Sequence, residues 1–419
     1  GAVGALFLAG GGRIGLHSKA REYFRSQTVV TIGLAPLLIG TFGNLSLISP
    51  LVNLIAIPFF TLAIVPLVLI ATLLLTMSTT LGAALLQWVD RILEWTWPAF
   101  EWSSRLPLAM WPLPQVPWWA FALLVAGAMV MIAPGVLATR LAGALLCLPA
   151  IFWQPTRPKD GEFELTALDV GQGLAVAVRT RDHVLIYDTG PNFRGGRDTG
   201  ELVLVPFLHA VGIRAIDAVV ISHGDADHVG GLQSLLAAVP TQRLLLGPSV
   251  AQQEHSELCA SGLNSRWNEV DFEIVHPSSD TNTIPSARKR RNDTSCVLRI
   301  RGSGGSVLLF GDIEAPAEQQ LIAANALTQT DIVTVPHHGS RTSSSPALIA
   351  ATSPQYALVS AGFGNRFGFP KSDVLARWQD SGAEVLETAT GGAIAIAVTR
   401  QGALAPRAYR LNEPRYWRQ

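Results

Sequence analysis

Four potential metal ligands lie within six residues of one another in the second half of the chain. His223, Asp225, Asp227 and His228 follow a short apolar run, and the pair Gly230-Gly231 comes directly after them. Carboxylates this close in a concave turn are costly to bury unless a cation compensates their charge. The alternative is a solvated, Asp-rich turn that happens to contain histidines. The order of strand, cluster, glycine pair and helix favours a metal site.

Two later segments offer further ligands, and each follows a run of β-forming residues. Asp312 comes after residues 307–310, and His337 and His338 come after residues 332–335. The histidine pair alone fits a hydrogen-bonded loop equally well. Because the ends of successive strands converge on one edge of the sheets, we expect these segments to meet the first cluster, with Asp312 as a bridging carboxylate.

A fourth strand ends at Tyr187-Asp188-Thr189-Gly190. We expect Asp188 to orient its turn by accepting backbone N–H groups, and to belong to the catalytic set without touching a metal directly.

The elements that must position these residues alternate along the chain from residue 163 onward. Strand pairs near each end, each followed by strand–helix units, predict an α/β fold of two sheets packed face to face with helices outside. One doubly wound sheet is the alternative. A dinucleotide site at Gly171-Gln172-Gly173 is not expected, because the third glycine is missing and another strand follows. The expected strands are 164–169, 174–180, 184–187, 218–222, 243–246, 272–275, 295–301, 306–310, 332–335, 356–360 and 393–398. The expected helices are 202–211, 231–239, 316–326, 346–351 and 372–381.

The composition changes near Pro155. The first 155 residues hold seven basic and four acidic residues and eight of the eleven tryptophans, which leaves 24 basic and 27 acidic residues for the rest. Over the whole chain, 31 basic residues balance 31 acidic ones, which excludes a globally basic nucleic-acid binder. Charged residues make up 15%, against about 25% in soluble domains, and the mean hydropathy is +0.32. We therefore expect a membrane region at 1–155 and a soluble domain at 156–419. The three cysteines are too few and too scattered for a disulfide framework or a thiolate zinc site.

Four apolar runs of about 20 residues are long enough to cross a bilayer as helices. They are 28–48, 51–77, 116–133 and 135–153, and a Trp-rich helix expected at 81–105 suits the interface. Pro58 and Pro66 are expected to kink the second run. The alternative is that these helices merely anchor the soluble domain.

The orientation of the membrane region depends on the number of spans. Basic residues before the first span favour a cytoplasmic start. Four spans would return the soluble domain to the cytoplasm, whereas three or five would place it outside, and the outer, periplasmic side is the one that we expect. Gly1 stands in an apolar stretch, and we expect the chain to be the C-terminal portion of a longer polypeptide.

The motifs taken together resemble the metallo-β-lactamase superfamily. The resemblance rests on Asp188-Thr189-Gly190, the cluster at 223–228, Gly311-Asp312 and His337-His338-Gly339-Ser340. More narrowly, Leu168-Asp169-Val170-Gly171-Gln172-Gly173 and the His-His-Gly-Ser run are similar to the C-terminal domain of the ComEC family of competence DNA-uptake channels. Residues 31–66 are similar to the last part of the competence transmembrane region of that family.

The resemblance implies a multi-pass channel of the bacterial inner membrane that takes up DNA during natural transformation. It implies a nuclease domain that hydrolyses phosphodiester bonds of the strand not transported, and single-stranded DNA, lipid and other competence proteins as partners. The implied metal ligands are His223, Asp225, Asp227, His228, Asp312 and His337, with His338 as the alternative to His337. Asp227, Asp188 and His338 are the expected catalytic residues, and Ser340 and Arg341 are expected to hold phosphate oxygens.

Departures from the superfamily pattern bear on the metal and on activity. Asp225 replaces the second histidine usual in zinc hydrolases, and this harder donor favours Mn²⁺ or Mg²⁺ over Zn²⁺, as one or two ions. Asn292–Ser295 stand where another histidine is usual, with His276 as a weak substitute, and Phe369 stands where many relatives carry a histidine. These changes disfavour β-lactam hydrolysis and leave a weakened or single-metal site open.

Two basic segments offer routes for nucleic acid. The run Arg288, Lys289, Arg290 and Arg291 is either a DNA contact or a solvated loop, and the tail at 407–418 suits base stacking or lipid headgroups equally.

Two functions compete with a channel joined to a nuclease. One is a membrane-anchored hydrolase of other phosphodiesters without transport, and the other is a catalytically inactive, DNA-guiding domain.

Overall fold

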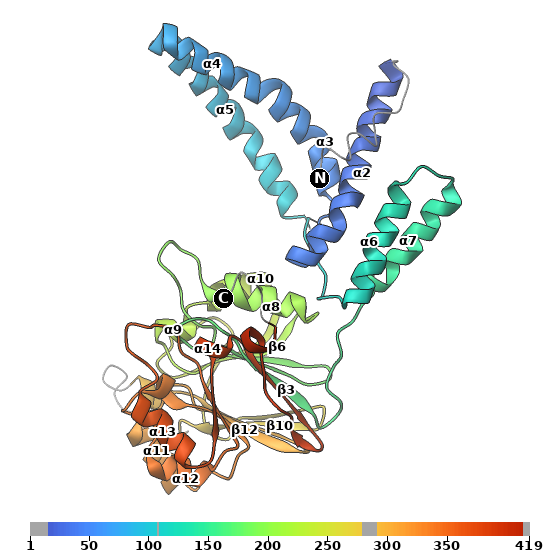
Figure 1. Cartoon of the computed structure of the whole chain (residues 1–419). Helices are drawn as coiled ribbons and strands as arrows, with labels where there is room; N and C mark the ends of the chain where they lie inside the picture. The colour runs from blue at the N-terminus through green and yellow to red at the C-terminus, as the bar shows by residue number, and fades with distance from the viewer. Residues whose placement is uncertain (1–15, 107–108, 279–290, 414–419) are drawn as a thin grey trace. The chain divides into compact units, whose positions relative to one another are not determined.

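The computed structural model describes residues 16–106, 109–278 and 291–413 (Figure 1). The chain divides into two compact units. The first comprises residues 1–155 and 209–212, and the second comprises residues 156–208 and 213–419.

The first unit is helical. Its elements are α2 (Leu16–Phe42), α3 (Ser49–Phe59), α4 (Val65–Met77), α5 (Thr79–Ser104), α6 (Trp118–Ile132) and α7 (Leu137–Ile151), with short strands β1 (Asn44–Leu45) and β2 (Trp111–Pro112) paired antiparallel. The expectation of one apolar helix over 28–48 was wrong at its end. The backbone of Gly43 has φ 63°, which ends α2 at Phe42 and turns the chain into β1.

One helix of this unit has the length and apolarity of a membrane span. α3, a π-helical turn at Phe60–Ile64 and α4 form a continuous helix from Ser49 to Met77, with 29 residues and a mean hydropathy of 2.7. The π-helical turn lies between Pro58 and Pro66, which lack the N–H group of a regular helical hydrogen bond. α6 and α7 are also apolar but have 15 residues each, and in the described part of the chain no other helix meets both criteria.

The second unit contains a nine-stranded mixed sheet. Its order is β17-β16-β3-β4-β5-β6-β7-β8, with β18 also on β16, and the strands from β5 to β8 run parallel. The bounds are β3 Phe163–Ala167, β4 Val176–Arg179, β5 Val184–Tyr187, β6 Ile216–Ile221, β7 Thr241–Leu246, β8 Ser256–Leu258, β16 Ile394–Thr399, β17 Gly402–Ala403 and β18 Arg407–Ala408. The short helices α9 (Ala226–Val229) and α10 (Leu232–Ala238) connect β6 to β7.

A second mixed sheet has seven strands in the order β15-β14-β13-β12-β11-β10-β9, parallel from β12 to β15. The bounds are β9 Asn264–Trp267, β10 Val270–His276, β11 Val297–Gly302, β12 Gly305–Leu309, β13 Ile332–Thr334, β14 Tyr356–Val359 and β15 Glu384–Glu387. The second unit therefore has the two sheets predicted from the sequence, and the alternative of a single doubly wound sheet was wrong. Every strand expected from the sequence overlaps an observed one, and β8, β9, β15, β17 and β18 were not expected.

The apolar core lies between the two sheets. One continuous cluster of buried side chains draws on both of them, for example Leu165 and Val220 from the first sheet and Leu298 and Leu309 from the second. The other face of the seven-stranded sheet is covered by α11 (Ala315–Ala323), α12 (Pro346–Thr352) and α13 (Ser372–Asp380), which bury Leu321, Leu348 and Trp378 against it. Each such buried side chain stabilises the folded state by roughly 1.5–3 kcal/mol.

A disulfide joins Cys259 to Cys296, whose Cα atoms lie 6.1 Å apart. The sequence did not predict this pair, because 37 residues separate the two cysteines and only the docked sheets bring them together. Cys147, in α7, is a free and buried cysteine.

Candidate metal centre

The ends of four parallel strands carry the residues singled out from the sequence. Asp188 follows β5, and the neighbouring strand β6 leads through Ser222 to His223. In the other sheet, Asp312 follows β12, and the neighbouring strand β13 leads to His337 and His338. Each sheet thus supplies one half of a cluster.

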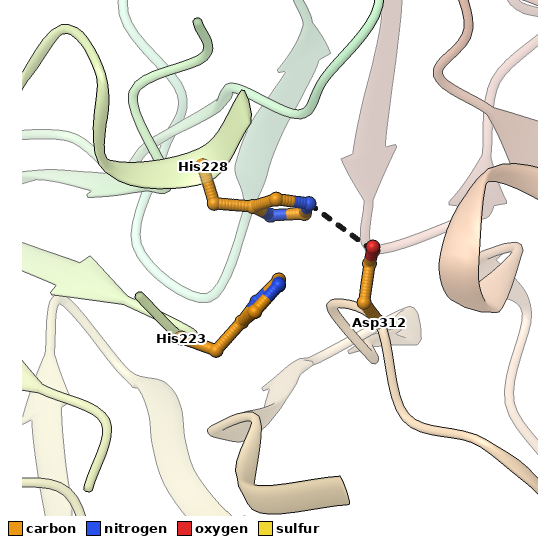
Figure 2. A group of neighbouring side chains, drawn as sticks. All are labelled: His223, His228 and Asp312. Carbon is orange, nitrogen blue, oxygen red and sulfur yellow. Dashed lines mark ion pairs between the residues drawn. The ribbon is translucent and has the colours of Figure 1, made fainter. Parts of the chain in front are cut away.

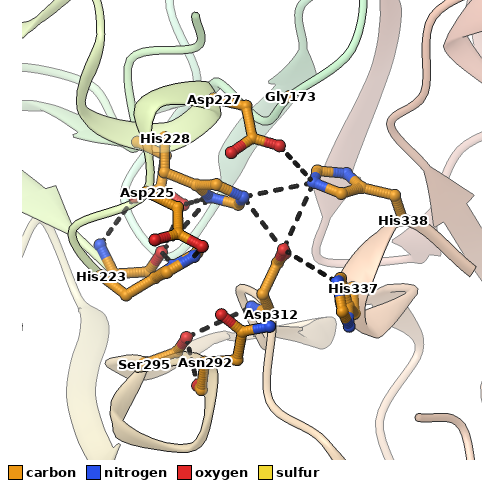
Figure 3. Close-up of polar contacts among 12 residues, drawn as sticks. Gly173, His223, Asp225, Asp227, His228, Asn292, Ser295, Asp312, His337 and His338 are labelled. Carbon is orange, nitrogen blue, oxygen red and sulfur yellow. Dashed lines mark hydrogen bonds and ion pairs between the residues drawn. The ribbon is translucent and has the colours of Figure 1, made fainter. Parts of the chain in front are cut away.

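The centre of the cluster is a set of close contacts between the two halves (Figure 3). His228 Nε2 lies 3.2 Å from Asp312 Oδ1 and 3.2 Å from His338 Nε2. His338 Nε2 lies 3.4 Å from Asp312 Oδ2 and 3.4 Å from Asp227 Oδ2. The two histidines are buried, and Asp227 is half-buried.

Two overlapping groups have the spacing of metal ligands. In each group, one ligand atom per residue lies within 4.8 Å of the others: His223, His228 and Asp312 form the first group (Figure 2), and Asp227, His228 and His338 form the second. In the first group, His223 Nε2 and Asp312 Oδ1 are buried and, among the residues that the structure describes, make no hydrogen bond. A buried nitrogen and a buried carboxylate oxygen that make no hydrogen bond are costly unless a cation compensates them.

The tautomers of two histidines also favour a cation. His228 Nδ1 lies 2.7 Å from Asp188 Oδ2, and His338 Nδ1 lies 2.7 Å from the carbonyl oxygen of Ser360. Both oxygens accept, so each Nδ1 carries the proton. Each Nε2 atom then either carries a second proton toward Asp312 or Asp227, or offers a lone pair to a cation between the two rings, whose Nε2 atoms lie 3.2 Å apart. The residues present therefore fit a divalent metal ion.

The pKa shifts of the cluster residues also favour a bound cation. Burial lowers the pKa of His228, but Asp312 and Asp188 outweigh it and hold that pKa well above its usual value. Burial raises the pKa of Asp312, but His228 and His338 outweigh it and hold that pKa well below its usual value. Burial and the neighbouring His228 lower the pKa of His223 to about 4. The cluster therefore keeps its carboxylate charged and attracts positive charge.

Asp188 lies behind the cluster, completely buried. Its carboxylate accepts hydrogen bonds from the Ser222 backbone N–H (2.6 Å), the Ser222 hydroxyl (2.7 Å) and His228 Nδ1–H. As expected, it accepts a backbone N–H group, and it also fixes the tautomer of His228.

Two other predicted ligands lie at the rim. Asp225 Oδ2 is 3.7 Å from His223 Nε2, and Asp225 Oδ1 is 3.4 Å from the Arg291 guanidinium. His337 Nε2 is 3.9 Å from Asp312 Oδ2, while its Nδ1 faces Glu314 at 3.2 Å.

The residues expected to hold phosphate differ in their accessibility. The Ser340 side chain is buried, with its hydroxyl 3.1 Å from that of Thr342. Arg341 is exposed and its Nε donates to Asp373 at 2.9 Å. Arg288, Lys289 and Arg290 lie outside the described residues, and Arg291 is exposed next to Asp225.

His276, the expected weak substitute for the missing histidine, lies outside the cluster. His276 is buried and its Nε2 is 2.8 Å from the carbonyl oxygen of Asp293, and burial lowers its pKa. Asn292 donates to Glu314 at 3.4 Å, and the Ser295 hydroxyl accepts from the Asp312 backbone N–H. This loop thus supports the backbone of Asp312.

Ser222, Glu314 and Ser360 contact the cluster residues, and the sequence analysis missed all three. Ser222 and Ser360 also follow the ends of parallel strands, which is the signal that could have identified them. Glu314 stands two residues after Asp312.

Gly173 brings the β3–β4 connection against the cluster. Its φ is 144°, and a Cβ atom there would lie 2.3 Å from the carbonyl oxygen of Asp227. The motif Gly171-Gln172-Gly173 therefore allows close backbone approach to the turn that carries Asp227.

Comparisons with known proteins agree with the motifs. Residues 1–137 match the family described as competence protein, and residues 168–246 match the metallo-β-lactamase superfamily. The chain is 33% identical over 411 residues to competence protein ComA of Neisseria gonorrhoeae, covering 97% of this chain and 56% of that protein. It is 26% identical over 399 residues to ComE operon protein 3 of Bacillus subtilis, covering 87% and 50%.

The metallo-β-lactamase fold protein YhfI from Bacillus subtilis is similar over 54% of this chain and 96% of its own, with 12% identity and a TM-score of 0.37. The chain spans about half the length of the curated relatives that it matches. The resemblance seen in the motifs is confirmed: the chain carries a domain of the competence-protein (ComEC/ComA) family followed by a domain of the metallo-β-lactamase superfamily.

Proposed function

We propose that this chain is part of a DNA-uptake protein of the bacterial inner membrane, and that its second domain is a metal-dependent nuclease acting on the strand that is not transported. The competence-protein match over residues 1–137 supports the role in uptake. The observation that carries the nuclease is the buried pair His223 Nε2 and Asp312 Oδ1, which make no hydrogen bond within the described residues at the meeting point of the two sheets.

The proposed ligands are the two overlapping groups, with Asp225 and His337 at the rim. Because His228 belongs to both groups, the site holds either one ion or two adjacent ions. The two groups combine three histidines with two carboxylates, and Asp225 and His337 add one donor of each kind at the rim. The carboxylates are the donors that favour Mn²⁺ or Mg²⁺ over Zn²⁺. Such an ion supplies Lewis acidity that makes a water more acidic and offsets the charge of a phosphate.

The other steps of hydrolysis are proposed to depend on three side chains, one that accepts a proton and two that position the histidines. Burial raises the pKa of Asp227, but the hydrogen bond from His338 and the charge of His228 outweigh it and lower that pKa. Asp227 is therefore ionised at neutral pH and is half-buried, which suits it to accept the proton of an attacking water. His338 donates through Nδ1 to Ser360 and so keeps Nε2 directed at the cluster. The contacts of Asp188 support a positioning role, exerted through His228, within the catalytic set in which the sequence analysis placed it.

Two arginines at the rim are proposed to attract the phosphate backbone. Arg291 lies over Asp225, and Arg341 is exposed although paired with Asp373. Ser340 is buried and would shape the loop between His337 and Arg341. Arg288, Lys289 and Arg290 lie outside the described residues, and they are proposed, as from the sequence, to contact DNA.

We further propose that residues 1–155 form the end of a multi-pass membrane region and residues 156–419 a hydrolase domain on the periplasmic side. The apolar helix Ser49–Met77 and the exposed apolar side chains along it support a lipid environment. Disulfides persist in oxidising compartments such as the periplasm, so the Cys259–Cys296 pair supports the outer side.

The test uses the 419-residue chain in detergent, chelated and then given Mn²⁺, Mg²⁺ or Zn²⁺ separately, with end-labelled single-stranded DNA. We expect cleavage with Mn²⁺ or Mg²⁺ and its loss in Asp227→Asn. Asp380→Asn, which changes an exposed carboxylate on α13, is the matched control and should cleave normally. Equal cleavage by Asp227→Asn and Asp380→Asn would contradict the assignment of the site.

A guiding domain without activity is the second candidate. It is favoured by the position of His276, which bonds to the Asp293 carbonyl instead of joining the cluster. DNA binding without cleavage under every metal would support it. Cleavage without any effect of Asp227→Asn on DNA uptake in competent cells would instead favour a membrane-anchored phosphodiesterase.

A further inference from the structure

A row of aromatic rings leads from the metal centre to the surface along the loop between β14 and α13. The ring of His337 lies 6.4 Å from that of His338 and 5.8 Å from that of Phe369. Phe369 stacks on Phe367 at 5.7 Å with an interplanar angle of 17°. Phe367 is 45% exposed, and Phe363 in the same loop is 84% exposed.

The loop is held in shape by Asn365. Its side-chain amide donates to the carbonyl oxygen of Gly362 at 2.9 Å, and its side-chain oxygen accepts the backbone N–H groups of Phe367 at 3.2 Å and Phe369 at 3.0 Å. The loop begins just after Ser360, whose carbonyl oxygen fixes His338. The rings are therefore positioned relative to the metal centre before any ligand binds.

Two cations accompany the rings. The Arg366 guanidinium carbon lies 4.7 Å from the ring centroid of Phe367, and Lys371 Nζ lies 5.3 Å from that of Phe369. Within the described residues, neither Arg366 nor Lys371 makes an ion pair with a carboxylate. Lys371 Nζ also donates to the carbonyl oxygen of Phe367 at 2.8 Å, a contact that leaves its charge in place. Exposed rings interleaved with cations that no described carboxylate neutralises suit single-stranded nucleic acid, because the rings stack on bases and the cations neutralise phosphates.

We propose that the loop at residues 361–371 is a base-stacking platform for single-stranded DNA, with Phe363 and Phe367 contacting bases and Arg366 and Lys371 contacting phosphates. The inference builds on the nuclease proposed above, for which the platform would hold the strand next to the cluster. An unpaired base has free faces, whereas a base inside a duplex is covered on both sides by its neighbours. The platform thus selects single strands over duplexes.

The experiment measures binding without cleavage. The 419-residue chain in detergent with EDTA is titrated with a fluorescent oligothymidine and with an abasic strand of equal length, and anisotropy is recorded. We expect the unchanged chain to bind oligothymidine more tightly than the abasic strand. Phe363→Ala and Phe367→Ala should each weaken oligothymidine binding by about 5-fold to 100-fold and leave abasic binding unchanged.

Two variants control for folding and for general loss of apolar surface. Phe363→Trp keeps an aromatic face and should retain the preference for oligothymidine. Leu404→Ala removes an apolar side chain that is 47% exposed and follows β17, and it should bind both strands like the unchanged chain.

Several results would overturn the platform. These are equal binding of both strands by the unchanged chain, equal weakening of both strands by the alanine variants, and no weakening at all. A lipid surface as the occupant would appear in phosphatidylglycerol nanodiscs as a blue shift in the emission difference between the Phe363→Trp chain and the unchanged chain, which has eleven tryptophans of its own. Strand binding would then be unaffected by Phe363→Ala. The nuclease proposal is decided separately, by cleavage in added metal, so either proposal can fail while the other stands.

Discussion

The Nε2 atoms of His228 and His338 lie 3.2 Å apart, although 110 residues separate the two histidines in sequence. One stands at the end of the nine-stranded sheet and the other at the end of the seven-stranded sheet, so their distance depends on how the sheets dock. Each ring donates its Nδ1–H to an oxygen. The facing nitrogens are therefore free to share a cation.

Metal binding is expected to stabilise the second domain. A ligand at 100 times its dissociation constant adds about 2.7 kcal/mol to the free energy of unfolding if it binds only the folded state. Mn²⁺ should therefore raise the thermal unfolding midpoint of the chelated chain, and Asp312→Asn should abolish this shift. Asp380→Asn should keep the shift, and a full shift in Asp312→Asn would show that the metal binds elsewhere.

Asp188→Asn is expected to weaken metal binding without removing a ligand. The substitution removes the charged acceptor that holds His228 Nδ1–H, and losing such a partner typically lowers metal affinity about 10-fold to 100-fold. Calorimetric titration with Mn²⁺ measures the change. Asp217→Asn is the control, because Asp217 makes a similar contact at 2.8 Å with His183, outside the cluster. A similar loss of affinity in both variants would argue against the positioning role of Asp188.

Gly173→Ala is expected to cost more stability than Gly171→Ala. Both glycines have positive φ, but a Cβ atom at Gly173 would lie 2.3 Å from the Asp227 carbonyl oxygen, whereas one at Gly171 meets nothing within 4 Å. Gly171→Ala should therefore cost only the backbone strain, about 1–3 kcal/mol. Gly173→Ala adds a displacement of the Asp227 turn, so its unfolding midpoint should be lower and its metal affinity weaker. Equal effects of the two changes would contradict the close approach.

Loss of the Cys259–Cys296 disulfide should destabilise the second domain. A cross-link closing a loop of 37 residues stabilises by roughly 3–4 kcal/mol in the chain-entropy description. Changing both cysteines to serine should lower the unfolding midpoint, whereas Cys147→Ser should not remove the cross-link. Alkylation of the denatured, unreduced chain followed by mass spectrometry should label Cys147 alone. Labelling of all three cysteines would refute the pair.

The sequence was sufficient for the features that depend on local pattern. Apolar runs ending in Asp or His predicted β5, β6, β12 and β13, because a buried strand must be apolar and its end must return to polar residues. The cluster at 223–228 and the residues Asp312 and His338 were predicted together for the same reason.

Features that depend on the docking of distant segments were not predictable in this way. Cys259 follows β8 in one sheet and Cys296 precedes β11 in the other, so they meet only when the two sheets pack against each other. Ser360 reaches His338 only after β14 pairs with β13. β15, with the sequence Glu384–Glu387, has acidic residues at both ends and lies at the edge of its sheet, so it lacks the apolar pattern of a central strand. His276 has the residue type of a ligand, but the backbone of Asp293 occupies its ring nitrogen.

The assembly of the centre from two sheets has a consequence for biosynthesis. The residues at 223–228 emerge from the ribosome long before His338, and Ser360, which fixes the His338 ring, emerges later still. A nascent or prematurely terminated chain that ends before residue 338 carries the first cluster without its opposite half. The complete cluster is thus available only after the chain has been made beyond β14, and a frameshift upstream of β14 would yield a product that lacks part of the cluster or of its support.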